Sequence, residues 1–343
     1  MSRSNALRCR SNALGGRLAV GVGRTLLLGL LLSPMVLSSA GCAANQPGSP
    51  DAVTRPNDRA SSNTGSSSNS GWPGLGNWSR PNPWSDLNPS ALHLQSASAL
   101  VMDEDGNRLY AKNPRDVRPI ASVTKLMTAM VVLDAGVPLN TKITIIEQDR
   151  DRLRNSRSRL RCDDATLSRR EMLMAALISS DNRAAHALAR TTFRGGTPVF
   201  VDAMNRKAQS LGMRDTYFAD SSGLNGLNRS TAEDLVKMVK AAGGYNVIRE
   251  TTSRGETTLY PFGSGTPLLY RNTNPLVRDP AWTVEVSKTG FINEAGHCLV
   301  MQTRIANRRL YMVFLNAAGR VTTAADGNRV RNWILSSRQT AAR

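Results

Sequence analysis

The sequence has few residues of the kinds that build metal and redox centres. In 343 residues it contains only three His and four Cys, and the cysteines form no CxxC pair. Structural metal sites and thiol redox centres need Cys and His at short, regular spacings. The composition therefore argues against a metal site.

The sequence also lacks an apolar run long enough for a comfortable membrane span. Residues 1–24 carry five Arg and no acid, and the segment TLLLGLLLSPMVLSSAGC that follows is short, contains Pro34 and ends in small residues. This order is typical of an export signal. We expect residues 1–41 to be that signal and the protein to be periplasmic or elsewhere in the cell envelope. An uncleaved N-terminal anchor helix is the alternative, although Pro34 disfavours it.

The end of this segment, SSAGC, resembles the lipobox of bacterial lipoproteins, in which cleavage leaves an acylated Cys at the new N-terminus. That residue is Cys42 here, but Ser39 stands where the motif usually has Leu. Membrane anchoring by a lipid on Cys42 and simple secretion therefore both remain open. Beyond it, Cys162 and Cys298 are expected to be free thiols, with a disulfide between them as the alternative in an oxidising compartment.

Residues 42–92 lack hydrophobic periodicity and are dense in Ser, Asn, Gly and Pro. Such a segment cannot bury enough surface to offset its ordering entropy, so we expect a flexible tether. The folded domain is then expected over residues 93–337, followed by a short tail, residues 338–343. Three of the five Trp lie in the tether and are expected to be exposed, with docking on the domain or on a wall polymer as the alternative: Trp72, Trp78 and Trp84.

The charge balance favours an anionic partner. The formal net charge is +18, and removal of residues 1–41, with their five Arg and no acid, leaves +13. No tight Lys/Arg run with interleaved aromatics appears, and an exported protein rarely meets nucleic acid. We therefore expect an acidic component of the cell envelope as partner, and no nucleic acid.

Strand patterns begin and end the domain, and helical patterns fill its middle. A β-hairpin is predicted where SASALVMDEDGNRLYAKN places two apolar runs around a DEDGN turn. Further strands are expected at residues 283–290, 297–306 and 309–317. Helices are expected at residues 122–135, 169–179, 182–191, 198–211, 231–242 and 323–336. The segments SRRE and STAE, which start at Ser168 and Ser230, have capping-box form. The order predicts an α+β fold with helices packed on a mostly antiparallel sheet.

Lysine is scarce as well, since it supplies only seven of the 44 basic residues, yet Lys125 lies inside the apolar helical pattern of PIASVTKLMTAMVVLDA. Ser122 precedes it by three residues, so the two side chains share a helix face. A neutral Lys can take the proton of a serine hydroxyl, whereas Arg stays charged. Ser122 is therefore a candidate nucleophile and Lys125 its base. A capping Ser beside a snorkelling Lys is the plain structural alternative.

Two further motifs contain residues suited to binding and proton transfer. Ser180 and Asn182 form an SxN triplet in SSDN, on a tight turn between two apolar helical patterns. Lys288, Thr289 and Gly290 form the only KTG in the chain and end a predicted strand. A strand offers rigid backbone donors, and Gly lets a ligand approach the backbone. Taken singly, each motif could equally be an ordinary turn or strand end.

Together and in this order, the motifs resemble the SxxK, SxN and KTG set of penicillin-recognising serine enzymes. Over residues 93–337 the chain most resembles the D-alanyl-D-alanine carboxypeptidase and endopeptidase family of low-molecular-mass penicillin-binding proteins. The segments that carry this likeness include RPIASVTKLMTAMVVLDA, SSDNRAA, MNRKAQSLGM, STAEDL, RNTNPLV and SKTGFINEAGHCLVM. The last of these is most similar to the endopeptidase subgroup, which cuts D-alanyl crosslinks between peptidoglycan stem peptides. The resemblance implies a β-lactamase/transpeptidase-like fold, with a five-stranded antiparallel sheet flanked by helices and a helical subdomain.

The same resemblance implies roles for single residues. Ser122 would be the acylated nucleophile, Lys125 its base, and Ser180 the relay of a proton to the leaving amine. The remaining motif residues would bind substrate, Lys288 would also lower the pKa of Lys125, and the amides of Ser122 and Phe291 would form the oxyanion hole. The implied substrate-binding residues are Asn182, Lys288, Thr289, Gly290 and Phe291. Peptidoglycan stem peptides would be the substrates and β-lactams the inhibitors, without a cofactor.

Three other functions remain as alternatives. A D-Ala-D-Ala carboxypeptidase would use the same residues. SDN is also the triplet of class A β-lactamases, but the ExxLN stretch that those enzymes use for deacylation does not occur here. A non-catalytic wall-binding lipoprotein would not need intact Ser122, Lys125 and Lys288. We therefore expect a serine DD-peptidase.

Overall fold

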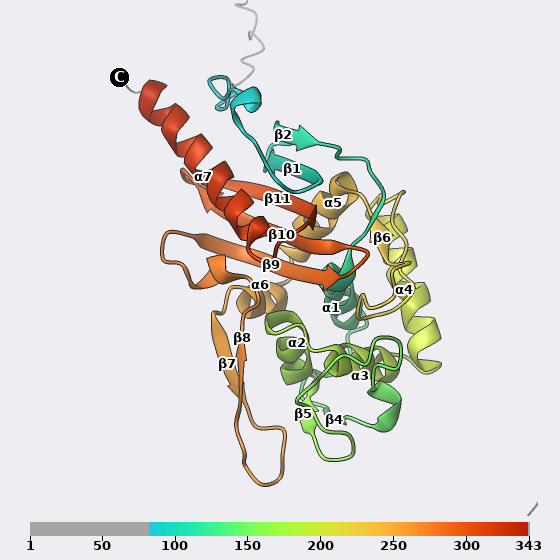
Figure 1. Cartoon of the computed structure of the whole chain (residues 1–343). Coiled ribbons are helices and arrows are strands. Elements are labelled where there is room, and N and C mark those ends of the chain that lie inside the picture. The colour runs from blue at the N-terminus through green and yellow to red at the C-terminus, as the bar shows by residue number, and fades with distance from the viewer. Residues whose placement is uncertain (1–81, 342–343) are drawn as a thin grey trace, which may run out of the picture. The chain divides into compact units, whose positions relative to one another are not determined.

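Strands from both ends of the domain meet in one antiparallel sheet. The computed structural model describes residues 82–341, without the side chains of residues 338–341. The sheet has the strand order β2-β1-β11-β10-β9 (Figure 1). Its strands are β1 (Ser98–Asp103), β2 (Arg108–Lys112), β9 (Thr283–Ile292), β10 (Gly296–Ile305) and β11 (Arg308–Ala317). The sequence pattern therefore predicted this sheet correctly, because β1, β9, β10 and β11 have the apolar content of buried strands and the edge strand β2 follows β1 after a short turn.

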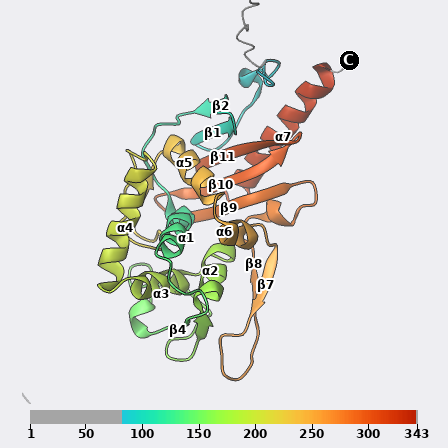
Figure 2. The same cartoon turned by 180° about the vertical axis from the view of Figure 1, so that it is seen from behind.

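Helices cover both faces of the sheet. The last helix, α7, packs on β10 and β11, while α5 packs on the opposite face against β1, β10 and β11 (Figures 1 and 2). The helices are α1 (Lys125–Asp134), α2 (Arg169–Ile178), α3 (Asn182–Thr192), α4 (Gly196–Ser210), α5 (Ala232–Ala242), α6 (Asn246–Thr252) and α7 (Thr322–Ala341). This arrangement confirms the expected α+β class. Helix α6 was not predicted, since its seven residues make too short a pattern to recognise.

Burial on both sides explains why the central strands are almost continuously apolar. Along β10, Leu299 and Met301 pack in the cluster that contains Trp333 of α7. Val300, between them, packs in the larger cluster with the helices of the other face. Successive residues of a strand point to opposite faces, so a sheet covered on both sides needs apolar residues at every position.

Three pairs of short strands lie outside the main sheet. They are β3 (Arg118–Pro119) with β6 (Arg229–Ser230), β4 (Lys142–Thr144) with β5 (Thr166–Ser168), and β7 (Glu256–Leu259) with β8 (Leu268–Arg271). The hairpin of β7 and β8 extends away from the helices in both views (Figures 1 and 2). Sequence analysis missed it, although the Gly/Pro-rich turn PFGSGTP between two four-residue runs is the signal that could have found it.

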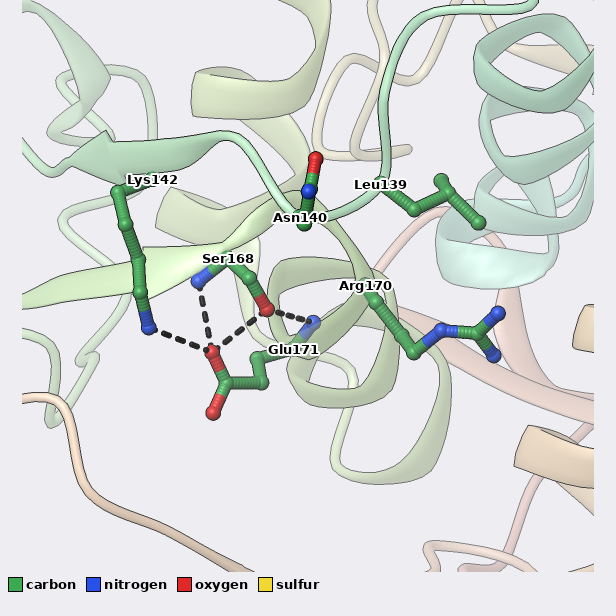
Figure 3. Close-up of a pocket in the computed structure, with 6 residues that line it drawn as sticks. All are labelled: Leu139, Asn140, Lys142, Ser168, Arg170 and Glu171. Carbon is green, nitrogen blue, oxygen red and sulfur yellow. Dashed lines mark hydrogen bonds and ion pairs between the residues drawn. The ribbon is translucent and has the colours of Figure 1, made fainter.

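The two predicted capping boxes have different outcomes. At the start of α2, the Ser168 hydroxyl accepts a hydrogen bond from the Glu171 amide at 3.3 Å, and the Glu171 carboxylate accepts one from the Ser168 amide at 2.7 Å (Figure 3). At α5 the cap is Thr231, whose hydroxyl accepts from the Asp234 amide at 3.1 Å. The box predicted at Ser230 is therefore wrong by one residue, because Ser230 belongs to β6 and its hydroxyl meets that of Thr216.

Packing starts earlier than the expected domain start at His93. Trp84 is only 5% exposed, lies in the α7 cluster, and donates from its indole nitrogen to the Asp103 carboxylate at 2.6 Å. The expectation of an exposed tether aromatic is thus wrong for Trp84, because the α7 face of the sheet offers an apolar surface that a sequence pattern does not show. Trp72, Trp78, the expected signal, Cys42 and most of the expected tether lie outside the described residues. Within residues 82–341, no helix combines the length and apolarity needed to cross a membrane.

Candidate active site

Ser122 lies in a tight turn that leads into a buried helix. The predicted helix over residues 122–135 is in fact a 3-10 turn, η2 (Ala121–Thr124), followed by α1 from Lys125. Ala121 just before Ser122 has a positive φ of 47°, which a non-glycine residue rarely adopts. In this turn the three-residue spacing still brings the two side chains together, with Lys125 Nζ 2.8 Å from Ser122 Oγ.

Lys125 is buried and held by oxygen atoms from three separate segments. Its side chain is 1% exposed. Besides Ser122 Oγ, its Nζ contacts Asn182 Oδ1 at 2.7 Å and the backbone carbonyl oxygen of Ser222 at 2.7 Å. These contacts fix the amine in one position, so the alternative of a snorkelling lysine with its head in solvent does not describe this residue.

Burial lowers the pKa of Lys125 to about 7, against the opposing charges of Asp220, Asp181 and Asp151. Desolvation disfavours the charged ammonium, and the three carboxylates favour it. The pKa of Lys288 is lowered well below its usual range, by burial first and then by the charge of Lys125. Burial is therefore the main cause of the lowered pKa of Lys125. The repulsion between the two amines disfavours protonation of both, and the expected contribution of Lys288 to the pKa of Lys125 stays a prediction.

The SDN turn joins α2 to α3 and places two polar side chains at a cleft. Ser180 has a φ of 62° and Asp181 caps α3, with its carboxylate accepting from the Ala184 amide at 3.1 Å. Asn182 connects the turn to Lys125 through its Oδ1, and its Nδ2 donates to the Ser156 hydroxyl at 2.8 Å. A surface helix-helix turn would leave these groups in solvent, whereas here Ser180 and Asn182 line the cleft beside Ser122.

The KTG residues lie on β9, the edge strand nearest to η2. A Cβ built on Gly290 would stand 2.8 Å from the Ile120 carbonyl oxygen and 3.0 Å from the Ser122 amide nitrogen. Only Gly therefore lets β9 pack this closely against the turn that holds Ser122. Lys288 is 1% exposed and donates to the Thr289 carbonyl at 2.9 Å, while the Thr289 hydroxyl donates to that of Thr273 at 2.6 Å.

The cleft between these elements has a volume of about 990 Å³. Some of its lining residues belong to the sequence motifs, and others were not expected from the sequence. Phe291 is 53% exposed and stacks on His297 at 4.3 Å between ring centres. The lining residues not named from the sequence include Arg154, Ser156, Thr273, His297 and Arg320. Thr273 lies in the segment RNTNPLV. The likeness of this segment to the family was the only sequence signal that could have pointed to Thr273. Lys288 is not part of the lining.

A second hollow, of about 580 Å³, lies at the start of α2 and shares no residue with the cleft. Two of its polar residues, Ser168 and Glu171, form the helix cap, and Glu171 also faces Lys142 at 3.5 Å (Figure 3). These contacts are structural. Among residues 82–341, no group of three or more His, Cys, Asp or Glu side chains is arranged to hold a metal ion.

A serine hydroxyl beside a buried amine of lowered pKa, at the edge of a strand that can supply amide donors, is the arrangement of a serine acyl-transfer enzyme. The family model described as D-alanyl-D-alanine carboxypeptidase matches residues 86–319. The chain belongs to this family of serine peptidases.

Its relatives include proteins described as D-alanyl-D-alanine endopeptidase. The one from Pseudomonas aeruginosa is 43% identical over 254 residues, which cover 74% of this chain and 81% of the relative. The one from Escherichia coli is 44% identical over 243 residues, which cover 70% and 77%.

Solved structures show the same fold. The Streptomyces K15 DD-transpeptidase is 26% identical, with a TM-score of 0.66 over 71% of this chain and 98% of that one. Penicillin-binding protein D2 of Listeria monocytogenes in its ampicillin-bound form is 29% identical, with a TM-score of 0.60 over 71% and 98%.

Proposed function

We propose that this enzyme is a D-alanyl-D-alanine endopeptidase that cuts D-alanyl crosslinks of peptidoglycan through an acyl-enzyme on Ser122. The observation that carries the proposal is the 2.8 Å contact between Ser122 Oγ and the buried amine of Lys125. The endopeptidase assignment is supported by the two relatives above that are 43% and 44% identical and bear that name. The carboxypeptidase activity named in the family description is the second candidate.

In the first step, neutral Lys125 takes the proton of Ser122 while Ser122 Oγ attacks the D-Ala carbonyl carbon. The developing oxyanion is stabilised by the amides of Ser122 and Phe291. The bond from carbon to nitrogen then breaks, and Ser180 relays the proton from Lys125 to the departing amine. Water next attacks the resulting ester and gives a proton to the again neutral Lys125. Lys125 passes this proton to Ser122 Oγ as the ester bond breaks, which restores both the free serine and the neutral amine. A lysine with a pKa of about 7 is suited to both transfers near neutral pH.

Substrate binding is assigned to the residues around this centre. Asn182, Thr289 and Gly290 line the cleft on its two sides and would hold the substrate backbone. Lys288 donates to the Thr289 carbonyl and would, with Thr289, help to bind the peptide end of the substrate. β-Lactams would enter the same cleft and acylate Ser122, as the ampicillin-bound relative suggests.

Covalent labelling tests the mechanism. A fluorescent penicillin is expected to label the wild-type protein and not the Ser122→Ala variant. Equal labelling of both proteins would overturn Ser122 as the nucleophile.

Crosslinked muropeptides test the substrate. The purified protein is expected to convert crosslinked dimers into monomers, and release of terminal D-Ala from pentapeptide without dimer cleavage would favour the carboxypeptidase. Slow turnover of penicillin itself, with neither peptide reaction, would favour a β-lactamase.

The site of action is proposed from the N-terminal sequence. We infer export directed by residues 1–41 and a lipid on Cys42 that tethers the peptidase to a membrane of the cell envelope. Labelled palmitate is expected to be incorporated into the wild-type protein and lost in Cys42→Ser. Incorporation that persists in this variant would contradict the assignment.

A further inference from the structure

An arginine-lined hollow lies next to the active-site cleft and has no part in the mechanism above. Its volume is about 440 Å³, and we call it the arginine hollow after the four side chains that dominate its lining: Arg150, Arg157, Arg159 and Arg183. The loop that forms most of it belongs to the Arg-rich stretch between β4 and β5. The hollow thus presents positive charge close to a site that handles peptides.

Most of this positive charge is not neutralised locally. Arg150 alone pairs with a carboxylate, Glu147 at 3.1 Å, and both side chains are about half exposed. Arg157 makes no ion pair or hydrogen bond with any other residue that the structure describes, and it is exposed. An exposed guanidinium without a partner can receive an anion without first breaking a native contact.

Neighbouring backbone and ring contacts hold two of the arginines in place without cancelling their charge. Arg159 donates to the Leu269 carbonyl at 2.6 Å and lies over the Tyr270 ring, 4.6 Å from its centre. Arg183 donates to the Leu160 carbonyl at 2.6 Å. Its Nε is buried and has no hydrogen-bond partner within the described part of the chain. Fixed guanidiniums lose little side-chain entropy when they bind a carboxylate.

The one acid in the lining, Asp151, is already engaged. It is 3% exposed, and its carboxylate accepts hydrogen bonds from the amides of Leu153 at 2.9 Å, Arg154 at 3.0 Å and Ser156 at 2.8 Å. Asp151 therefore stabilises the loop through its backbone amides, and it forms no ion pair with the four arginines of the lining.

Ser156 joins the hollow to the active-site cleft, since it lines both. Its hydroxyl accepts the hydrogen bond from Asn182, and Asn182 in turn contacts Lys125. A peptide held beside Asn182 can therefore continue across Ser156 into the hollow. Arg157 lines the hollow and not the cleft, so a β-lactam confined to the cleft would not contact it.

We propose that the arginine hollow is a subsite for a carboxylate of the substrate peptide, and that it favours crosslinked stem peptides over smaller acyl donors. The proposal rests on the proposed function, because crosslinked stems carry free carboxylates on both branches beyond the scissile bond. Arg157 receives the carboxylate as a bidentate partner, and Arg159 and Arg183 add fixed positive charge around it.

The test compares Arg157→Gln with wild type on a crosslinked muropeptide dimer and on the same dimer with its carboxylates converted to amides. With the free acid, KM is expected to rise about threefold to tenfold in Arg157→Gln, with little change in kcat. With the amidated dimer the two proteins are expected to have equal KM. Arg157→Lys should recover part of the loss, and the rate of penicillin acylation should stay at the wild-type value.

Arg152→Gln is the matched control. Arg152 lies on the same loop and its side chain is 75% exposed, but it pairs with Glu147 and does not line the hollow. Its KM for the free-acid dimer is expected to stay near wild type. An equal rise of KM in the two variants would mean that the effect is a general attraction between opposite charges, which would overturn the subsite. A shift in Arg157→Gln that persists with the amidated dimer would also overturn it.

Binding without turnover separates this proposal from the function it rests on. In the Ser122→Ala background, the Kd of the free-acid dimer is expected to rise by the same factor when Arg157 is replaced by Gln. If wild type leaves dimers intact, the endopeptidase proposal fails. If the Kd in the Ser122→Ala background does not change when Arg157 is replaced by Gln, the subsite proposal fails, whatever the result with wild type.

Discussion

The Cα of Gly223 packs directly against the carbonyl of Ala121, so closely that a Cβ at position 223 would stand 1.9 Å from that carbonyl oxygen and 2.8 Å from the Ser122 amide nitrogen. Gly223 also has a φ of 82°, in the region that favours glycine. The neighbouring Ser222 carbonyl holds Lys125. One turn thus positions the backbone of Ser122 and the amine of Lys125 at the same time.

Replacing Gly223 by Ala is expected to displace this turn. The strained φ alone costs about 1–3 kcal/mol of unfolding free energy, and the clash with the Ala121 carbonyl should displace the turn that holds Ser122. We expect a large fall in the rate of penicillin acylation and only a small fall in the melting temperature. Gly226→Ala is the matched control, since a Cβ there has nothing within 4 Å and Gly226 has no positive φ. Normal acylation in Gly223→Ala would contradict the positioning role.

The pH dependence of acylation should follow Lys125. The reaction needs the neutral amine, and the pKa of Lys125 is about 7. Below this pH the ammonium predominates, so the acylation rate should rise about tenfold for each pH unit and level off above it. Measurement of the second-order rate constant of penicillin acylation between pH 5 and 9 tests this. A profile that stays flat through pH 7 would exclude Lys125 as the base.

Lys125→Arg keeps a positive charge but cannot accept a proton near neutral pH. Acylation is expected to fall by at least about a hundredfold, the usual contribution of a general base. The variant should still fold if its guanidinium reaches the oxygens of Asn182 and Ser222, which circular dichroism can check. A folded variant with wild-type acylation would remove Lys125 from its role.

Arg154 connects three segments around the cleft. Its Nε donates to the Leu224 carbonyl at 2.6 Å, and its guanidinium pairs with Glu294 in the β9–β10 turn at 2.9 Å. Arg154→Gln is expected to lower kcat/KM for penicillin acylation by about threefold to tenfold, because two segments lose a shared contact. Glu294→Gln should have a smaller effect, since the ion pair is partly exposed and the bond to Leu224 remains. The reverse order of the two effects would contradict this interpretation.

Trp84 should matter for stability, although it lies far from Ser122 in the sequence. Its side chain is 5% exposed and packs on the α7 face, so Trp84→Ala is expected to lower the free energy of unfolding by about 3–5 kcal/mol. Trp84→Phe keeps an aromatic ring in this packing and loses the hydrogen bond to Asp103, so its cost should be smaller than that of Trp84→Ala. Tyr260→Ala, at a side chain that is 62% exposed, is the control and should change stability by less than about 0.5 kcal/mol. Denaturant titration measures all three.

Much of the fold could be predicted because local sequence patterns indicate the individual strands and helices. Apolar runs with short turns indicated the five strands of the sheet, and periodic apolar residues indicated most helices. The exceptions have physical causes. The cap of α5 is Thr231 and not Ser230 because Ser230 pairs in β6, and the β7–β8 hairpin was missed because its strands are only four residues long.

The sequence by itself determined which residues are chemically suited to the reaction: a serine and a lysine at a three-residue spacing, the SDN turn and the KTG strand. Only the tertiary structure decided their environment. The partners of Lys125 lie 57 and 97 residues away along the chain, and one of them is a backbone carbonyl that no side-chain pattern reveals. Burial of the amine, and with it a pKa near 7, arises when η2, α3 and the Ser222 turn close around it. The same closure places Arg154 and the arginine hollow beside the cleft, since contacts between segments distant in sequence form only when the chain folds.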